Sequence, residues 1–232
     1  MPDTGPDQPG SPELRASAQQ GPGPEQADAA ASPAEAASIA QAAALVTSVA
    51  PRRSAEEQIR AAGLELVGSC EHLSAWPELM RRSALLQDFT PAEADILGQA
   101  MLLVRAQPGQ VLIAEDEPSD WMMLLLRGTV DVGKRKIGTQ GDKEEPGENT
   151  RLAVLKEGAV IGEMSMLDGE PRYASCWALS EVEAAVLSRA AVSRLITSNP
   201  GVGAKLLVKL TQLLAQRLRN TSNQLVKLLQ KT

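Results

Sequence analysis

Short apolar segments separated by glycine, proline and acidic residues fill the middle of the chain, from Gly109 onwards. Segments of this length and spacing are typical of strands joined by tight turns, whereas helices need longer runs with a helical period. The predicted strands are Val111–Ala114, Met122–Leu126, Thr129–Val132, Leu152–Leu155, Ala174–Leu179 and Val182–Leu187. Such a series predicts an antiparallel β-barrel or jelly roll.

Helical patterns flank the strand region, which makes the predicted fold class α+β with N-terminal helices and a long C-terminal helix. Ser54–Leu66 opens with a serine N-cap and acidic residues, and Thr90-Pro91-Ala92-Glu93 combines an N-cap, a first-turn proline and a capping glutamate. Between them, the apolar cluster His72–Leu86 is interrupted at Trp76-Pro77, because proline restricts the residue before it. We therefore predict a helix boundary at this dipeptide.

Beyond Arg189 the sequence predicts a short helix to Ile196, a break at Asn199-Pro200-Gly201, and a long final helix. Leucines and threonines recur there at alternating spacings of four and three, the pattern of a seam between two helices. The seam positions are Leu207, Thr211, Leu214, Leu218, Thr221, Leu225 and Leu228. The adjacent face, with Leu206, Leu210 and Leu213, suits packing on the barrel. Because the repeat continues past the barrel, we favour a homodimer over a single amphipathic helix.

Residues 1 to about 38 are rich in Pro, Gly, Gln, Ala and Asp, a composition that cannot offset the entropy of ordering, and residues 39–50 are mildly apolar and Ala-rich, as in a nascent helix. We predict three regions: a disordered tail over 1–50, a helical segment over 51–84, and a main domain over 85–232 that ends in a dimerisation helix at about 200–232. Within the main domain, the polar stretch Lys134–Arg151 indicates an exposed, mobile hairpin tip. A partner contact at this tip is the alternative.

Charge and cysteine content narrow the partners and the compartment. The net charge is −6 and the pI about 5.0, which argues against direct binding of DNA. Cys70, in a predicted helix, and Cys176, in a predicted strand, form no disulfide framework. With neither a membrane span nor a signal peptide visible, these features predict a cytoplasmic protein.

The segment Ile161–Cys176 brings together groups that suit a small phosphate ester. Gly162 permits a close approach of the backbone, and the run that follows it can form one helical turn whose N–H groups favour an anion. Arg172 supplies a permanent positive charge, and Glu163 a carboxylate for a hydroxyl group. The alternative is a structural ion pair between Glu163 and Arg172, which is costly inside an apolar β-domain.

The pattern Gly-Glu-x-x-x-Leu, a short turn and Pro-Arg-x-Ala-Ser-Cys closely resembles the phosphate-binding cassette of the cyclic nucleotide-binding domain family. The resemblance extends from about Leu85 to the C-terminus, because an acidic turn at 115–117, an apolar strand at 121–126 and Arg127-Gly128 appear in the family's order. It resembles most the ligand-binding domain of the catabolite activator protein, without a DNA-binding domain after the last helix.

This resemblance implies that Glu163 binds the ribose 2′-hydroxyl and that Arg172 binds the cyclic phosphate. Tyr173 departs from the family pattern, in which many members carry a small residue. Thr221 and Ser222 resemble an adjacent pair that meets the adenine across the dimer, although polar residues tolerated on a dimer helix are the alternative. The implied ligand-binding residues are Gly162, Glu163, Met164, Ser165, Arg172, Tyr173, Ala174, Thr221 and Ser222.

The resemblance implies a non-enzymatic cytoplasmic sensor that binds a cyclic nucleotide, most simply cAMP, and signals through its C-terminal helix to an unidentified effector protein. We expect no cofactor, metal or membrane contact. A cupin-like metal enzyme is disfavoured because the sole histidine, His72, lies outside the barrel. A cyclic di-GMP receptor and a ligand-free dimerisation scaffold of the same fold remain as alternatives.

Overall fold

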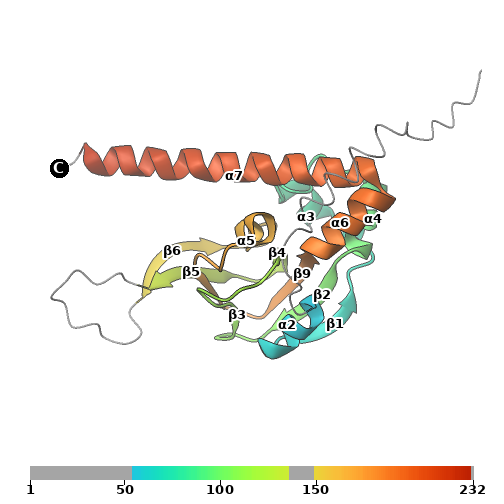
Figure 1. The fold of residues 1–232 in the computed structure, drawn as a ribbon, viewed down its shortest axis with the longest axis horizontal. Helices are drawn as coiled ribbons and strands as arrows, with labels where there is room; N and C mark the ends of the chain where they lie inside the picture. The colour runs from blue at the N-terminus through green and yellow to red at the C-terminus, as the bar shows by residue number, and fades with distance from the viewer. Residues whose placement is uncertain (1–53, 136–148, 231–232) are drawn as a thin grey trace, which may run out of the picture.

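The computed structural model describes residues 54–135 and 149–230, and these residues form two antiparallel sheets covered by helices (Figure 1). The five-stranded sheet has the order β1-β2-β9-β4-β7, and the four-stranded sheet has the order β3-β8-β5-β6. The strands are β1 (Glu65–Ser69), β2 (Leu102–Ala106), β3 (Val111–Ile113), β4 (Trp121–Arg127), β5 (Val130–Arg135), β6 (Asn149–Leu155), β7 (Val160–Ile161), β8 (Ser175–Ala178) and β9 (Val182–Ser188). The predicted α+β jelly-roll fold is confirmed.

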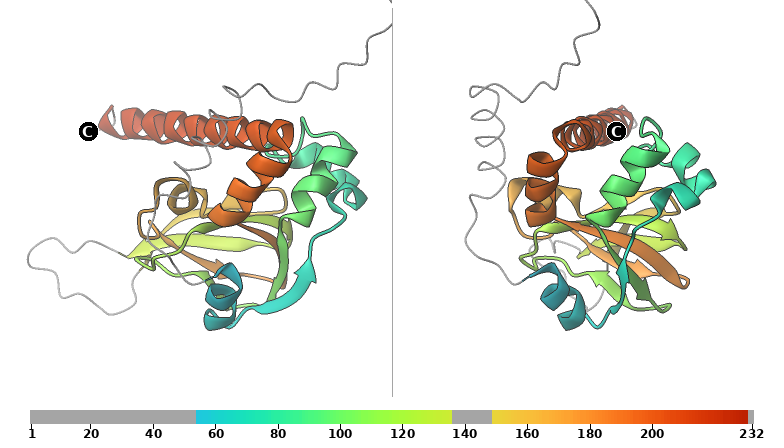
Figure 2. Two further views of the ribbon diagram at one scale, coloured as in Figure 1. Left: turned by 45° about the vertical axis from the view of Figure 1, so that its right-hand side comes forward. Right: turned by 90° about the vertical axis from the view of Figure 1, so that its right-hand side faces the viewer.

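Helices precede, interrupt and follow the strands. They are α2 (Ala55–Ala61), the 3-10 helix η1 (Leu73–Ala75), α3 (Pro77–Arg82), α4 (Pro91–Gln99), α5 (Glu163–Asp168), α6 (Arg189–Ser198) and α7 (Pro200–Leu229). Figure 2 shows that α4, α6 and α7 gather over one side of the sheets, whereas α2 lies on the opposite side. Helix α5, within the segment Ile161–Cys176, lies beneath α7 in Figure 1.

Strand β4 separates two apolar cores. Residues from Trp121 to Leu126 are all buried, as expected for a strand covered on both faces. Because successive side chains point to opposite faces, Met122 and Leu124 join the core beneath the helices, while Met123 and Leu125 join the core between the sheets. Pairing of Met123 with Val186 of β9 and with Ile161 of β7 fixes the register that places the cassette at the end of this sheet.

The N-terminal segment differs from its prediction. Helix α2 ends at Ala61 instead of continuing to Leu66, because Gly63 adopts a left-handed φ of +72° and the chain then enters β1. β1 pairs with β2, so the region predicted to be helical contains an edge strand, and Cys70 follows this strand instead of lying in a helix. Strands β1, β2 and β7 were absent from the predicted set.

The other predicted boundaries agree closely with the structure. All six predicted strands are present, α3 begins at Pro77 after Trp76, and Thr90 and Glu93 form a reciprocal capping box at the start of α4. The short helix α6 continues to Ser198, and Pro200 starts α7 instead of lengthening the break. The predicted tail (1–50) and the centre of the predicted hairpin tip (136–148) lie outside the described residues, and β5 and β6 extend into the ends of that tip.

Helix α7 belongs to the domain core only in its first half. Leu206 and Leu210 are buried in the core beneath the helices and Leu213 packs against it partly buried, as predicted for the face that covers the barrel, and Val202 also joins this core. From Gln216 to Gln230 every described residue is exposed, including the seam leucines Leu218 and Leu225. Figure 1 shows this half continuing past α5.

Lys205 of α7 forms an ion pair with Glu93 in the first turn of α4. Its Nζ lies 2.6 and 2.7 Å from the two carboxylate oxygens of Glu93, whose Oε2 also accepts a hydrogen bond from the Thr90 amide at 2.8 Å. These hydrogen bonds, first that from Lys205 and then those from Thr90, lower the pKa of Glu93 from 4.5 to about 2. The capping residue of one helix therefore also anchors another.

This lowered pKa predicts acid sensitivity. Since the folded pKa of Glu93 lies below its ordinary value, its contribution to stability is complete above pH 4.5 and is lost as the pH falls from 4.5 towards 2. Glu93→Gln should flatten this part of the profile of melting temperature against pH, measured by circular dichroism. Glu78→Gln, which removes an exposed carboxylate on α3, is the matched control. If the pH profile of the melting temperature for Glu93→Gln runs parallel to that of the wild type, the Glu93–Lys205 ion pair does not cause the acid sensitivity.

Candidate functional site

The cassette backbone is shaped by Gly162, between β7 and α5. Its φ of +76° lies in the left-handed region, and a Cβ built there would collide with Nη1 of Arg172. Gly169 ends α5 with a second left-handed residue at +82°. Both glycines are thus required by conformation, and Gly162 also by the close approach of Arg172.

Arg172 points into the domain and is almost completely buried, at 2% exposure. Its Nη1 donates to the Gly162 carbonyl at 2.7 Å, its Nη2 donates to the Trp121 carbonyl at 2.6 Å, and its Nε donates to the Ser119 hydroxyl. The guanidinium also lies 4.3 Å from the centre of the Trp121 ring, a cation–π contact. Three of its five N–H groups are engaged in these hydrogen bonds.

The charge of Arg172 has no carboxylate partner at salt-bridge distance among residues 54–135 and 149–230. Burial lowers the pKa of its guanidinium to about 10, while the more distant charges of neighbouring acidic residues oppose this shift. The group is therefore still protonated at neutral pH. A buried cation held only by neutral acceptors provides a favourable position for an anion.

Glu163, the first residue of α5, is paired with α7. Only 1% of the residue is exposed, and its Oε1 accepts a hydrogen bond from Nη1 of Arg217, whose Nη2 donates to the Val160 carbonyl. The alternative ion pair between Glu163 and Arg172 is not formed. Instead, one arginine of the long helix reaches the cassette and holds its buried carboxylate.

A cavity of about 140 Å³ lies between the cassette, the strands and Arg217. Seven residues of the predicted site line it: Gly162, Glu163, Met164, Ser165, Arg172, Tyr173 and Ala174. The remaining wall comes from Ile113, Val132, Leu152, Leu155, Ile161, Cys176 and Arg217. Its volume is below the range of about 300–1,000 Å³ for small-molecule sites, so a nucleotide requires the cavity to open further.

Thr221 and Ser222 do not belong to this cavity. Both are exposed on α7, beyond Arg217, and are not among the residues that line it. Their predicted contact with a ligand bound by another protomer therefore stays a prediction.

Tyr173 lies at the mouth of the cavity, where 58% of it is exposed. Lys134 of β5 donates to the Tyr173 carbonyl at 2.7 Å and lies 4.1 Å from the centre of its ring, while Glu115 accepts a second hydrogen bond from the same ammonium group at 3.1 Å. The one site residue that departs from the predicted family pattern is thus held at the rim and does not fill the cavity.

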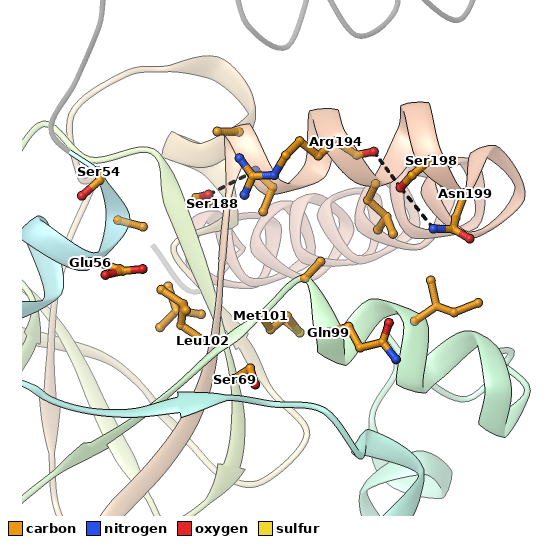
Figure 3. A pocket seen from close by; sticks show the side chains of 17 residues that line it. Ser54, Glu56, Ser69, Gln99, Met101, Leu102, Ser188, Arg194, Ser198 and Asn199 are labelled. Carbon is orange, nitrogen blue, oxygen red and sulfur yellow. Dashed lines mark hydrogen bonds between the residues drawn. The ribbon is translucent and has the colours of Figure 1, made fainter.

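A second, larger cavity of about 460 Å³ lies on the far side of α6, between α2, α4 and β2 (Figure 3). Its α6 wall includes Ala190, Ala191, Arg194 and Ser198, and its floor includes Met101 and Leu102. No residue of the predicted site lines it. In the part of the chain that the structure describes, no cluster of His, Cys, Asp and Glu suits a metal ion.

Comparison with known proteins relates this geometry to a family. Residues 103–199 match the family model described as the cyclic nucleotide-binding domain. A solved cyclic nucleotide-binding domain from Methylobacillus flagellatus KT is 31% identical, with a TM-score of 0.60, over 71% of this chain and 88% of that one. This chain belongs to the cyclic nucleotide-binding domain family.

This cyclic nucleotide-binding domain is also similar to two bacterial proteins. The catabolite activator protein of Thermus thermophilus is 27% identical, with a TM-score of 0.55, over 63% of both chains. The CRP-like cAMP-activated global transcriptional regulator of Mycobacterium tuberculosis is 28% identical over 152 residues, which are 66% of this chain and 62% of the regulator. The chain therefore spans less than two thirds of that curated relative.

Residues that the sequence-based prediction missed complete the site of this cyclic nucleotide-binding domain. Arg217 gave no local signal, because its partner Glu163 lies 54 positions away in the chain. Ser119 and the Trp121 carbonyl, which hold Arg172, also come from a distant segment.

Among the described helices, none is both long and apolar enough to span a membrane.

Proposed function

We propose that this domain is a non-enzymatic cytoplasmic sensor that binds a purine cyclic mononucleotide, cAMP in the first instance, in the cavity at the cassette. The observation that carries the proposal is Arg172: a buried guanidinium beside the left-handed Gly162, without a carboxylate partner among the described residues. A cyclic phosphate supplies the missing negative charge, and the two N–H groups that these hydrogen bonds leave over can donate to its oxygens.

Glu163 is placed to accept a hydrogen bond from the ribose 2′-hydroxyl, because its carboxylate is buried at the cavity and its other hydrogen-bond partner there is Arg217. Ligand entry then changes the surroundings of Arg217, which belongs to α7. A ligand that contacts two positions of α7 differently shifts the balance between them. We therefore place the output of the sensor in α7.

The choice of cAMP rests on two supports. The Mycobacterium tuberculosis relative is cAMP-activated by its name, and Thr221 and Ser222 supply hydroxyl groups suited to an adenine edge if a second protomer brings them to the cavity. We propose a homodimer through the exposed seam of α7, with an unidentified effector protein as partner. Buried, unpaired Cys70 and Cys176 are compatible with a reducing cytoplasm.

We keep the division into a tail over 1–50, an N-terminal segment over 51–84 and a cyclic nucleotide-binding domain over 85–232 as part of this proposal. The alternative ligand, cyclic di-GMP, carries a second phosphate and needs further cations. The nearby arginines of β5 and β6 are already paired, Arg135 with Asp116 and Arg151 with Asp131. This pairing favours the mononucleotide.

Calorimetric titration of the full chain with cAMP, cGMP and cyclic di-GMP tests the proposal. We expect saturable binding of cAMP with one site per chain and weaker binding of cGMP. Tighter binding of cyclic di-GMP would replace the ligand assignment, and no binding of any of the three would favour the ligand-free scaffold.

Glu163→Gln tests the ribose contact separately from the phosphate contact. The substitution should weaken cAMP binding about tenfold, because a hydrogen bond to a charged group is lost, and should affect 2′-deoxy-cAMP much less, because that ligand lacks the hydroxyl. Competition binding of both ligands to both proteins measures the difference. Equal losses for the two ligands would show that Glu163 acts through Arg217 alone.

A further inference from the structure

Arg189 is a second buried arginine, with 4% exposure, and the cavity at the cassette does not include it. It is the first residue of α6, yet its side chain crosses to α5. Its Nε donates to the Met166 carbonyl at 2.7 Å and its Nη2 to the Ser165 carbonyl at 3.1 Å. Within the described ranges 54–135 and 149–230, the guanidinium forms no ion pair with an Asp or Glu.

The contact between the Arg189 side chain and the α5 carbonyl groups stabilises α5 more than it stabilises α6. The last carbonyl groups of a helix lack partners within it unless the capping residue donates to them, as the Gly169 amide does to the Ser165 carbonyl at 3.1 Å, and a cation near them is stabilised by the helix dipole. A cation at the first residue of a helix is disfavoured by the same dipole, so Arg189 gains at α5 and not at α6. Because α5 has only six residues, too few to be stable alone, such outside contacts decide where it lies.

Arg189 is also fixed at its backbone to the segment that holds Arg172. Its amide donates to the Asp120 carbonyl at 2.8 Å, and the residues on either side of Asp120 are Ser119 and Trp121, both acceptors for Arg172. One short segment therefore anchors the phosphate-binding arginine and the start of α6 together.

Helix α6 packs tightly against α7 on one side and borders the second cavity on the other. A Cβ at Gly203 of α7 would lie 2.8 Å from Ile196 of α6, so the two helices are packed in close contact. The opposite face of α6, with Ala190, Ala191 and Arg194, borders the 460 Å³ cavity in Figure 3. This space leaves room for α6 to move, and a movement of α6 would act on α5 through the Arg189 side chain.

We propose that Arg189 is a positioning residue that couples the cassette helix α5 to α6 and α7, so that ligand affinity and the position of α7 depend on each other. The inference rests on the proposed function for the identity of the ligand. By linkage, a bound ligand that orders α5 holds α6 through Arg189, and a partner that holds α7 raises ligand affinity by the same factor.

The test compares full-length wild type with Arg189→Met, which keeps the apolar stem but donates no hydrogen bonds. Arg194→Met, five residues later on the same helix and exposed, is the matched control. Hydrogen exchange followed by mass spectrometry reports on residues 163–169 and 200–215, and calorimetry measures cAMP affinity. We expect Arg189→Met to weaken binding about tenfold or more, since two charge-assisted hydrogen bonds are lost, and to speed exchange in α5 without ligand.

A merely structural role would lower the melting temperature but leave the response of α7 intact. With cAMP at saturation, we expect the ligand-induced change in exchange over residues 200–215 to disappear in Arg189→Met and to persist in Arg194→Met. Unchanged affinity together with unchanged α5 exchange, or a persisting α7 response, would overturn the coupling. If Arg189→Met does not fold by circular dichroism, Arg189→Lys, which retains the charge, decides by the same measurements.

Failure of the proposed function would look different. If wild type binds no cyclic nucleotide, the ligand is wrong, but faster exchange of both α5 and the start of α7 in ligand-free Arg189→Met would still support the coupling. Unchanged exchange in that comparison would reject it.

Discussion

Arg172→Gln is expected to weaken cAMP binding by a factor of about 30 to 3,000, the loss typical of removing one partner of a buried charged pair. The guanidinium is the cation that the structure places at the cavity beside Gly162, and glutamine supplies neither its charge nor its fork of donors. Titration calorimetry of the purified full-length variant measures the change.

The same substitution also affects the fold, because Ser119 and the Gly162 and Trp121 carbonyls lose their donor. Glutamine retains an amide that can satisfy one of these acceptors, which makes it preferable to alanine. Arg151→Gln, which removes an arginine from an exposed pair on β6, is the matched control. Wild-type affinity in Arg172→Gln at a normal melting temperature would refute the role of Arg172 in phosphate binding.

Replacing Leu218 and Leu225 together by Glu should convert a dimer into a monomer. These seam leucines are 69% and 56% exposed, so burying them is a gain that only association provides. Four leucines across two chains contribute about 6 kcal/mol or more, and four carboxylates in their place repel one another. Light scattering coupled to size exclusion measures the mass of each protein over a range of concentrations.

The neighbouring Val226→Glu provides the control for this pair. Val226 is exposed to a similar degree, at 50%, but lies off the seam, so its substitution should leave the dimer intact. A monomeric wild type, or equal effects of the seam and control substitutions, would rule out this interface. Deleting α7 is a poorer experiment, because Val202, Leu206 and Leu210 belong to the core of the domain.

Local sequence signals predicted the parts of the molecule that local interactions determine. The capping box of Thr90 and Glu93, the glycine at position 162 that permits a close approach and the apolar strand β4 each depend on a few neighbouring residues. By contrast, β1 is short, exposed on most of its length and bulged between Leu66 and Gly68, so no alternation of polar and apolar residues revealed it.

The direction of side chains within the site was beyond sequence-based prediction for a related reason. Arg172 turns inward because Ser119 and the Trp121 carbonyl lie where its nitrogens can reach them, a meeting of segments more than fifty positions apart. The pairing of Glu163 with Arg217 requires knowledge of where α7 crosses the cassette. Such contacts depend on the assembled fold and not on spacing along the chain.

The stacking of Arg172 on Trp121 gives the domain an optical property of its own. The chain contains three tryptophans, and Trp121 is the one whose ring lies 4.3 Å from this cation and is buried from solvent, whereas Trp76 and Trp177 are only half-buried. Indole emission depends on the electric field around the ring, and an anion arriving at Arg172 changes that field. Native fluorescence therefore offers a label-free signal of occupancy, at protein concentrations too low for calorimetry.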